Sequence, residues 1–253
     1  MFPMKTFASI TAMIASIIAI AACTPPHHAA VPAAEPTLRL TLIPESALPK
    51  DKTTIIDAKL NVIKTRDLVL KEDLTQPLQL LVIDPTLTDF TLITPRETKI
   101  PGLYSFPFAL KSPSGYRVWA DVKPGIALSK KQLEEFPMTD LGSRKAAAIN
   151  KTPMLEANVG GDHFALSFDK APIEGEESTG TITGKDGAPI HAGGEIIGFY
   201  DDFRTVLRTP LDDKHTFTLA PAHAGFIKLF AKLQIGGKTV SVPFGVNLGK
   251  AAD

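Results

Sequence analysis

This chain is poor in cysteine and has no excess of charge of either sign. Cys23 is its only cysteine in 253 residues, which excludes a fold held by disulfides and any zinc site built from clustered cysteines. The 27 Lys and Arg residues are balanced by 27 Asp and Glu residues, so a strongly basic nucleic-acid-binding protein is excluded and no nucleic acid is expected as a partner. Hydrophobic residues make up 44% of the chain, which excludes a disordered polar chain and indicates a globular protein of one or two domains.

The one long apolar run lies at the start of the chain. Lys5 precedes it, and residues Phe7–Ala22 are interrupted only by Ser and Thr. This run is shorter than the roughly 20 residues that a spanning helix needs, and it ends in small residues. The pattern therefore predicts that residues 1–22 are a secretory signal peptide.

The junction after this run has a second signature. Residues Ile20–Cys23 read IAAC, which resembles the bacterial lipoprotein signal, in which the cysteine is acylated, with palmitate among the lipids, and becomes the first residue. The resemblance implies a membrane anchor on Cys23, and no other cofactor is expected. Thr24 in place of Asp resembles lipoproteins sorted to the outer membrane, which implies a location on its periplasmic face. An ordinary signal peptide followed by a chance cysteine remains the alternative.

Residues 23–36 are expected to form the lipidated cysteine and a tether. Four prolines and no apolar period occur between Thr24 and Pro36. In polyproline II geometry, at about 3.1 Å per residue, such a segment reaches roughly 40 Å.

Beyond the tether the apolar residues recur every second position, which is typical of strands with one buried face. Examples are the runs Leu38–Leu42, Phe164–Phe168 and Val240–Leu248. Turn signals rich in Gly, Pro and Asp separate such runs, and no long helical period is present. The sequence therefore predicts an all-β protein.

The strand pattern is duplicated. Tyr116–Val122 matches Ile227–Leu233 in residue class at all seven positions, and Leu81-Val82 aligns with Ile196-Ile197 upstream. Each copy spans about 100 residues, the size of an immunoglobulin-like β-sandwich. We therefore expect two tandem immunoglobulin-like sandwiches, at 37–143 and 153–250, joined by a linker at 144–152.

Three segments of the first copy, residues 80–90, 101–106 and 115–121, resemble bacterial secreted proteins built from YtkA-like β-sandwich domains. Residues 236–246 resemble the closing hairpin of the same family. The resemblance implies tandem sandwiches and, in some members, an association with copper or other heavy metals. The histidine-rich turn of the family is absent, because Thr91–Pro95 and Val206–Pro210 contain no histidine.

Histidines are the remaining candidates for metal binding. A pair lies in the tether and three lie in predicted loops of the second copy, where one of them follows two aspartates. Imidazole nitrogens bind Cu(II) and Zn(II), but histidines in a polar spacer or a solvated loop are also common without a metal. The weak metal candidates are His27, His28, His191, His215 and His223.

No catalytic arrangement is recognisable. The Gly-x-Ser-x-Gly motif is missing, and adjacent carboxylates on a strand point to opposite faces. Two aromatic residues, Trp119 and Phe230, instead fall on the predicted outer faces, where loops or the other copy cover them or where they form a binding patch. Phe199 and Tyr200 lie either in a buried strand or in a binding loop.

These features together predict a non-catalytic envelope lipoprotein. It is expected to act as a binding or interaction module, held to the membrane by its lipid and recognising an envelope protein or a small ligand. An accessory role in periplasmic copper handling is the alternative.

Overall fold

The computed structural model describes residues 38–44, 48–62, 66–123, 136–142, 147–184, 191–235 and 237–251, without the side chains of residues 191–193. The predicted signal peptide, Cys23, the tether and its His27 and His28 lie outside these residues. Residues 36–253 form one compact unit, distinct from residues 1–35. Among the described residues, no helix has the length and hydrophobicity to cross a membrane.

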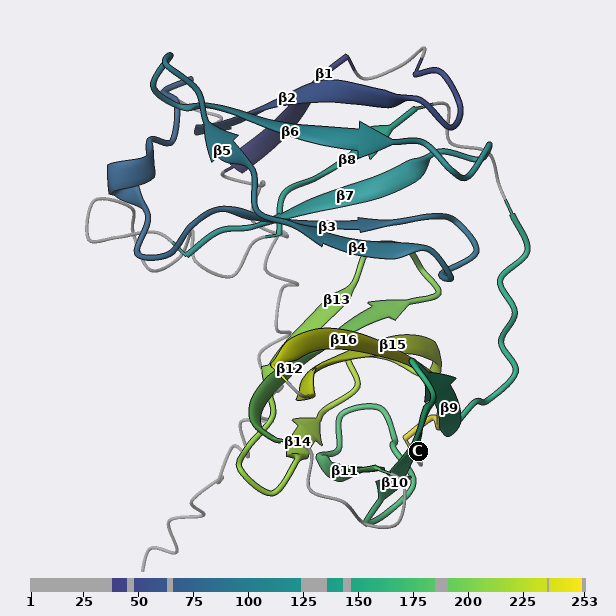
Figure 1. Cartoon of the computed structure of the whole chain (residues 1–253). Helices are drawn as coiled ribbons and strands as arrows, with labels where there is room; N and C mark the ends of the chain where they lie inside the picture. The colour runs from purple at the N-terminus through teal and green to yellow at the C-terminus, as the bar shows by residue number, and fades with distance from the viewer. Residues whose placement is uncertain are drawn as a thin grey trace, which may run out of the picture. The chain divides into compact units, whose positions relative to one another are not determined.

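The first half of the chain folds into two antiparallel sheets packed face to face (Figure 1). One sheet has the order β1-β2-β6-β5 and the other the order β4-β3-β7-β8. A short 3-10 helix, η1 (Lys71–Asp73), precedes β3. The strands are β1 (Leu38–Ile43), β2 (Thr53–Val62), β3 (Gln79–Ile83), β4 (Phe90–Ile93), β5 (Arg96–Glu97), β6 (Leu103–Ala109), β7 (Tyr116–Asp121) and β8 (Met138–Leu141).

The second half repeats this arrangement, with sheets ordered β14-β11-β10-β9 and β13-β12-β15-β16. The described residues contain no α-helix, so the all-β prediction is confirmed, and the four antiparallel sheets fit tandem sandwiches. The strands are β9 (Glu156–Val159), β10 (Asp162–Phe168), β11 (Ser178–Gly184), β12 (His191–Tyr200), β13 (Val206–Pro210), β14 (Thr216–Leu219), β15 (Gly225–Ile235) and β16 (Lys238–Leu248).

Each sandwich has its own core, built from every second residue of its strands. On β1, the side chains of Leu38, Leu40 and Leu42 point into the first core, which also contains Leu80 and Val82 of β3. The second core is built in the same way from inward residues of β10, β12, β15 and β16. The two-residue period in the sequence thus reports directly which face of each strand is buried.

Met154, in the connection between the two sandwiches, is held by two backbone hydrogen bonds. Its N–H donates to the Gly245 carbonyl at 2.8 Å, and the Gly245 N–H donates back to the Met154 carbonyl at 2.9 Å. The connecting segment therefore docks on β16 before β9 begins.

Strand pairing corrects one detail of the internal repeat. Leu81 lies opposite Trp119, and Ile197 lies opposite the matching Phe230. Leu81 therefore corresponds to Ile197, and the sequence alignment with Ile196 was one residue out. Alternation could not fix the register here, because β3 and β12 carry apolar residues on both faces.

Candidate functional site: the contact between the two sandwiches

The sheets that contain β3 and β12 have apolar side chains on both faces. On β3, Leu80 and Val82 enter the first core, while Leu81 and Ile83 point the other way and are also fully buried. On β12, Ile197 has the same outward direction and is equally buried. A strand buried on both faces must be covered by a second layer.

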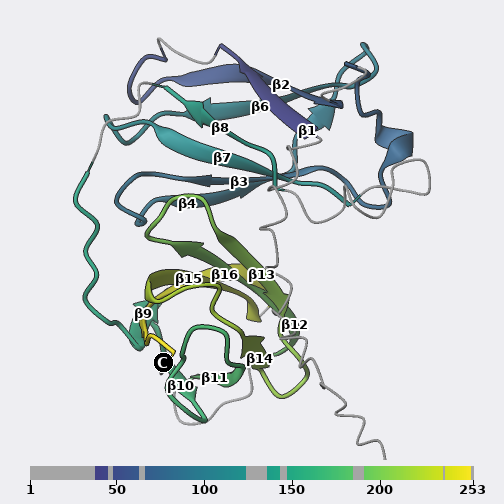
Figure 2. The same cartoon turned by 180° about the vertical axis from the view of Figure 1, so that it is seen from behind.

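That layer is the matching sheet of the other sandwich. Outward residues of the two sheets form a third apolar cluster, distinct from the two cores. Both views in Figures 1 and 2 show β3 and β4 on the side of the first sandwich that faces β13 and β15. The fully buried members of this interface cluster are Leu81, Ile83, Leu87, Trp119, Ile197, Phe199 and Phe230.

Aromatic rings form the centre of the interface cluster. Phe90 of β4 lies with its ring centroid 5.2 Å from Phe199 and 4.7 Å from Phe230, and Trp119 lies 5.3 Å from Phe199. The rings are tilted relative to one another, the arrangement that the ring quadrupole favours. Each such pair contributes about 1 kcal/mol beyond the apolar area that it buries.

The structure decides between the alternatives for the four aromatic candidates. Trp119, Phe199 and Phe230 are 1%, 1% and 4% exposed, because each sandwich covers the outward face of the other. Tyr200 turns inward and belongs to the core of the second sandwich. These side chains therefore join the two sandwiches or fill a core, and offer no surface to an outside partner.

Charged residues continue the contact at one end of the same sheets. Arg208 of β13 forms an ion pair with Asp121 of β7, and its Nε lies 2.6 Å from Oε2 of Glu195 on β12. Lys232 Nζ lies 3.3 Å from the other oxygen of Glu195. Asp121 is 8% exposed. Burial lowers the pKa of Arg208, which still remains a cation at any physiological pH.

A crevice of about 380 Å³ opens beside this ionic group. It is lined by Asp121, Lys123 and Phe136 of the first sandwich and by Glu195 and Arg208 of the second. Asp121, Glu195 and Arg208 of its lining already pair with one another.

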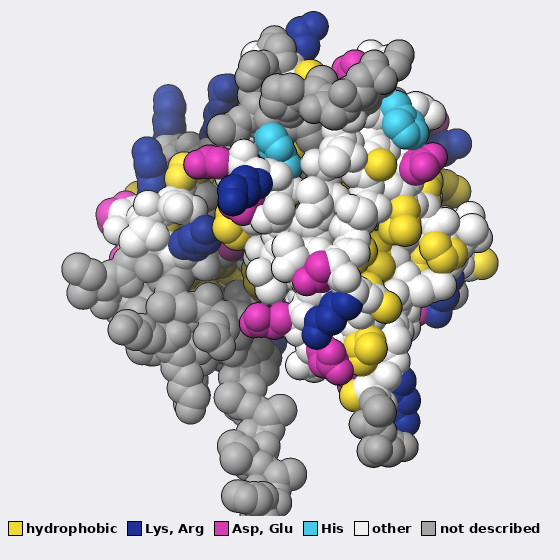
Figure 3. Space-filling model, turned by 90° about the horizontal axis from the view of Figure 1, so that it is seen from below, with side chains coloured by type: hydrophobic (Ala, Val, Ile, Leu, Met, Phe, Trp, Pro, Cys, Tyr) yellow, Lys and Arg dark blue, Asp and Glu magenta, His cyan; other side chains and the backbone are white. Residues whose placement is uncertain are grey.

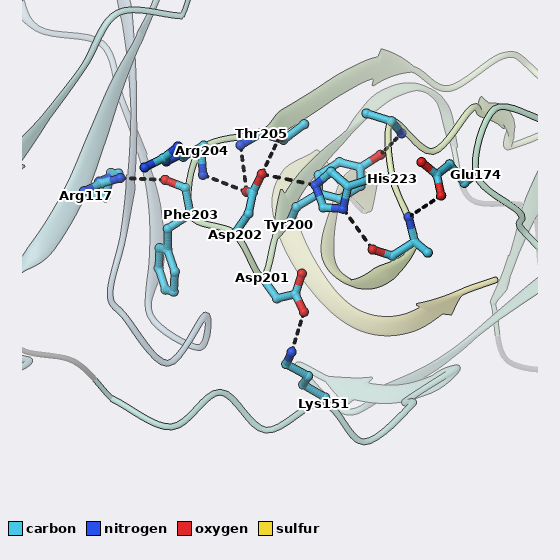
Figure 4. Close-up of polar contacts among 12 residues, drawn as sticks. Arg117, Lys151, Glu174, Tyr200, Asp201, Asp202, Phe203, Arg204, Thr205 and His223 are labelled. Carbon is cyan, nitrogen blue, oxygen red and sulfur yellow. Dashed lines mark hydrogen bonds and ion pairs between the residues drawn. The ribbon is translucent and has the colours of Figure 1, made fainter. Parts of the chain in front are cut away.

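The turn between β12 and β13 crosses to the first sandwich (Figure 4). Asp202 closes the turn by accepting hydrogen bonds from the Arg204 N–H at 2.7 Å and the Thr205 N–H at 2.9 Å. Phe203, held at a φ of 55°, packs against the interface cluster. Its carbonyl accepts a 2.7 Å hydrogen bond from Nη1 of Arg117 on β7. Leu87, at the matching place in the β3–β4 turn, has a similar φ of 61° and is also in the cluster.

His223 supports this turn from the β14–β15 loop. Its Nδ1 lies 2.9 Å from the Ala224 carbonyl and its Nε2 lies 3.1 Å from Oδ2 of Asp202. Both partners are acceptors, so both ring nitrogens must donate, and only the imidazolium form satisfies both contacts. The Ala224 carbonyl, together with Asp202, raises the pKa of His223 above its ordinary value.

The carboxylates around His223 are also engaged. Burial acts to raise the pKa of Asp202, but hydrogen bonds from the turn and from His223 outweigh it and hold that pKa below its ordinary value. Asp201 forms an ion pair with Lys151 at 2.5 Å, and Glu174 accepts the Ala224 N–H at 3.3 Å. The ring of His223 packs on Tyr200, with centroids 4.7 Å apart.

The structure does not bring the described candidate metal ligands together. His215 lies in the turn before β14 and His223 in the loop after it, so β14 separates them. The side chain of His191, like His27 and His28, is outside the described part of the chain. Within that part, no group of three or more His, Cys, Asp or Glu side chains could hold a metal ion.

Sequence reasoning missed the charged residues of the interface. Asp121 and Arg117 lie on the predicted outer face of β7, where charges are ordinarily solvated. No sequence pattern around Arg208 indicated that this residue lies at the interface. The usable signal was the apolar outer face of β3, which required a covering layer.

No family model matches this chain, and no curated protein matches it either. Its function therefore has to be inferred from the residues and their contacts.

Proposed function

We propose that this protein is a non-catalytic lipoprotein of the bacterial envelope, anchored through Cys23 and facing the periplasm. Its paired sandwiches act as one rigid binding or interaction module for an envelope protein or a small ligand. The lipoprotein-like segment Ile20–Cys23, followed by Thr24, supports the anchor and the outer membrane as its site. The proline-rich tether supports display of the module at a distance from the bilayer.

The binding role is supported mainly by the way in which the charged and titratable side chains pair with one another. Asp121, Arg208 and Glu195 neutralise one another at the interface, and His223 pairs with Asp202. In the described residues these groups hold the two sandwiches and the β12–β13 turn in place. A rigid body of this kind presents its loops at fixed positions, which suits recognition.

The anchor is tested on protein isolated from bacterial envelopes. Mass spectrometry of the N-terminal peptide is expected to show a chain that begins at Cys23 and carries acyl groups. Gradient separation of the envelope is expected to place it with the outer membrane. A chain that begins at Met1, or an unmodified Cys23, would contradict the proposal.

The binding role is tested by photo-crosslinking in the same cells. A crosslinking residue at Thr88 or Lys214, in exposed turns of the first and second sandwich, is expected to capture a defined partner. The matched control places it at buried Leu81, where only other residues of this chain are within reach. Equal crosslinking patterns from all three positions would count against recognition by the turns.

A further inference from the structure

The outer face of β1 and β2 gathers basic side chains. Because Leu38, Leu40 and Leu42 point into the first core, Arg39 and Thr41 point outward. Arg39 lies opposite Asn61 and Thr41 lies opposite Lys59 on β2. Arg66, in the connection that follows β2, joins them. We call Arg39, Lys59 and Arg66 the basic face.

A hollow of about 500 Å³ lies on this surface. Its lining combines two guanidinium groups with a hydroxyl and an amide. Asn61 Nδ2 donates to the Arg66 carbonyl at 3.2 Å and thereby holds Arg66 beside the strand, at a φ of 63°. The lining residues are Arg39, Thr41, Asn61, Val62 and Arg66.

On the outward face of β1 and β2 the three cations of the basic face stand against one acid, Asp57, which lies opposite Ile43. Among the described residues, none of them forms an ion pair, whereas Arg117 and Arg208 are both paired at the interface. Unpaired guanidinium groups are free to form bidentate hydrogen bonds with an external oxyanion such as phosphate.

The second sandwich shows that the fold does not require this charge. Leu40 pairs with Leu60 in the first core, and Leu166 pairs with Ile182 at the same place in the second. The positions that match Arg39, Thr41, Lys59 and Asn61 are therefore Ala165, Ser167, Thr181 and Thr183, none of them charged.

The second sandwich also lacks a gathered basic surface on the side shown in Figure 3. There, acidic and basic side chains lie next to one another among uncharged atoms. The basic face thus lies on the copy that follows the predicted anchor.

We propose that the basic face binds the phosphate groups of anionic phospholipid headgroups in the membrane that holds the anchor. This inference rests on the proposed lipidation of Cys23, because Arg39 follows that residue by only sixteen positions. A tether of that length keeps the basic face at a high effective concentration near the bilayer. Each basic residue near an anionic surface strengthens binding by roughly 5-fold, so three give on the order of 100-fold.

The experiment uses the chain from Thr24 onward, which lacks acyl chains but contains the whole compact unit of residues 36–253. It is mixed with vesicles of phosphatidylcholine alone or with about a third phosphatidylglycerol, at low salt, and sedimented. We expect binding to the anionic vesicles only, reduced on the order of 100-fold in the R39A/K59A/R66A variant. Thermal unfolding followed by circular dichroism verifies that each variant is folded.

A matched variant, K214A/K238A/K250A, removes the same charge from exposed positions of the second half. It is expected to bind like the parent chain. Equal losses in both variants, or no loss in either, would overturn the proposal. A second experiment titrates the same chain with inorganic phosphate. Saturable binding of free phosphate without binding to vesicles would contradict the proposal that the phosphate groups belong to the membrane.

A failure of the proposed lipid anchor is detected by a separate measurement. An unacylated N-terminus found by mass spectrometry contradicts the proposed function. Vesicle binding by the unacylated chain depends only on the basic face, so the two results are distinguishable.

Discussion

Aspartate residues close several turns of this protein by the same chemistry. Asp84, Asp202 and Asp212 each accept hydrogen bonds from backbone N–H groups that follow them and from a threonine hydroxyl. The side chain thus supplies the acceptors that a tight turn leaves missing. At Asp202 the same carboxylate also binds His223, which adds a titratable group to the turn.

The protonation of His223 is expected to make stability depend on pH. Its pKa is raised in the folded state, so its contribution is complete below its ordinary pKa of about 6.5 and is lost as pH rises through the raised value. We predict that the urea midpoint falls between pH 6 and pH 8.5 and that His223→Gln removes much of this slope. Urea unfolding at several pH values measures this slope, and NMR titration of the imidazole measures the pKa of His223.

The matched variant for this prediction is Asp202→Asn, tested alone and together with His223→Gln. Because the two side chains form one contact, the double variant should show little more than the larger single effect. Strict additivity would mean that the contact is not formed in solution.

At the level of elements, the β3–β4 turn depends on a buried carboxylate. Asp84 is 4% exposed and accepts the Thr88 and Asp89 N–H groups, each at 2.9 Å. This turn also places Leu87 in the interface cluster. It therefore serves both the hairpin and the contact between the sandwiches.

We predict that Asp84→Ala lowers the free energy of unfolding by about 3 kcal/mol, because the N–H groups of Thr86, Thr88 and Asp89 lose their buried acceptor. Asp212→Ala is the matched control, since that exposed turn has the same kind of hydrogen bonds but water can replace them. Urea unfolding measures both. Equal losses would show that burial of the turn does not matter.

At the level of the whole molecule, the two sandwiches are joined by apolar and ionic contacts side by side. The interface cluster supplies most of the buried apolar area, while Arg208 links Asp121 of the first sandwich to Glu195 of the second. Removal of one member of such a buried group leaves the others uncompensated.

We predict that Arg208→Met destabilises the contact by roughly 3 kcal/mol, because buried Asp121 then loses its ion-pair partner and Glu195 keeps only Lys232. Each sandwich keeps its own core, so the variant should open between the sandwiches before either one unfolds. Small-angle X-ray scattering is expected to show a larger radius of gyration, and limited proteolysis faster cleavage near residues 147–153.

Lys170→Ala is the control for this prediction, because its ion pair with Glu176 lies exposed within the second sandwich. It should leave both readouts unchanged. If Arg208→Met instead unfolded the chain in a single step, with no form in which the sandwiches are separated, the prediction would be wrong. The two sandwiches and the ionic group would then form one cooperative unit.

Strand periodicity, turn residues and the repeat of Tyr116–Val122 in Ile227–Leu233 were enough to predict an all-β chain with two similar halves. These signals are local, since each depends on neighbouring residues along one strand. Such local signals could not fix the alignment between the two copies, because β3 and β12 are apolar on both faces. Only the pairing of Leu81 with Trp119 and of Ile197 with Phe230 resolved it.

The sequence by itself determined which residues face each core and where an anchor is to be expected, because side-chain alternation and a signal motif are written along the chain. The tertiary structure alone decided that Trp119, Phe199 and Phe230 contact one another, that Asp121 pairs with Arg208, and that Arg39, Lys59 and Arg66 form no ion pair with another described residue. Such contacts join residues far apart in the chain, and their energies depend on burial and distance in three dimensions, which no spacing along the sequence records.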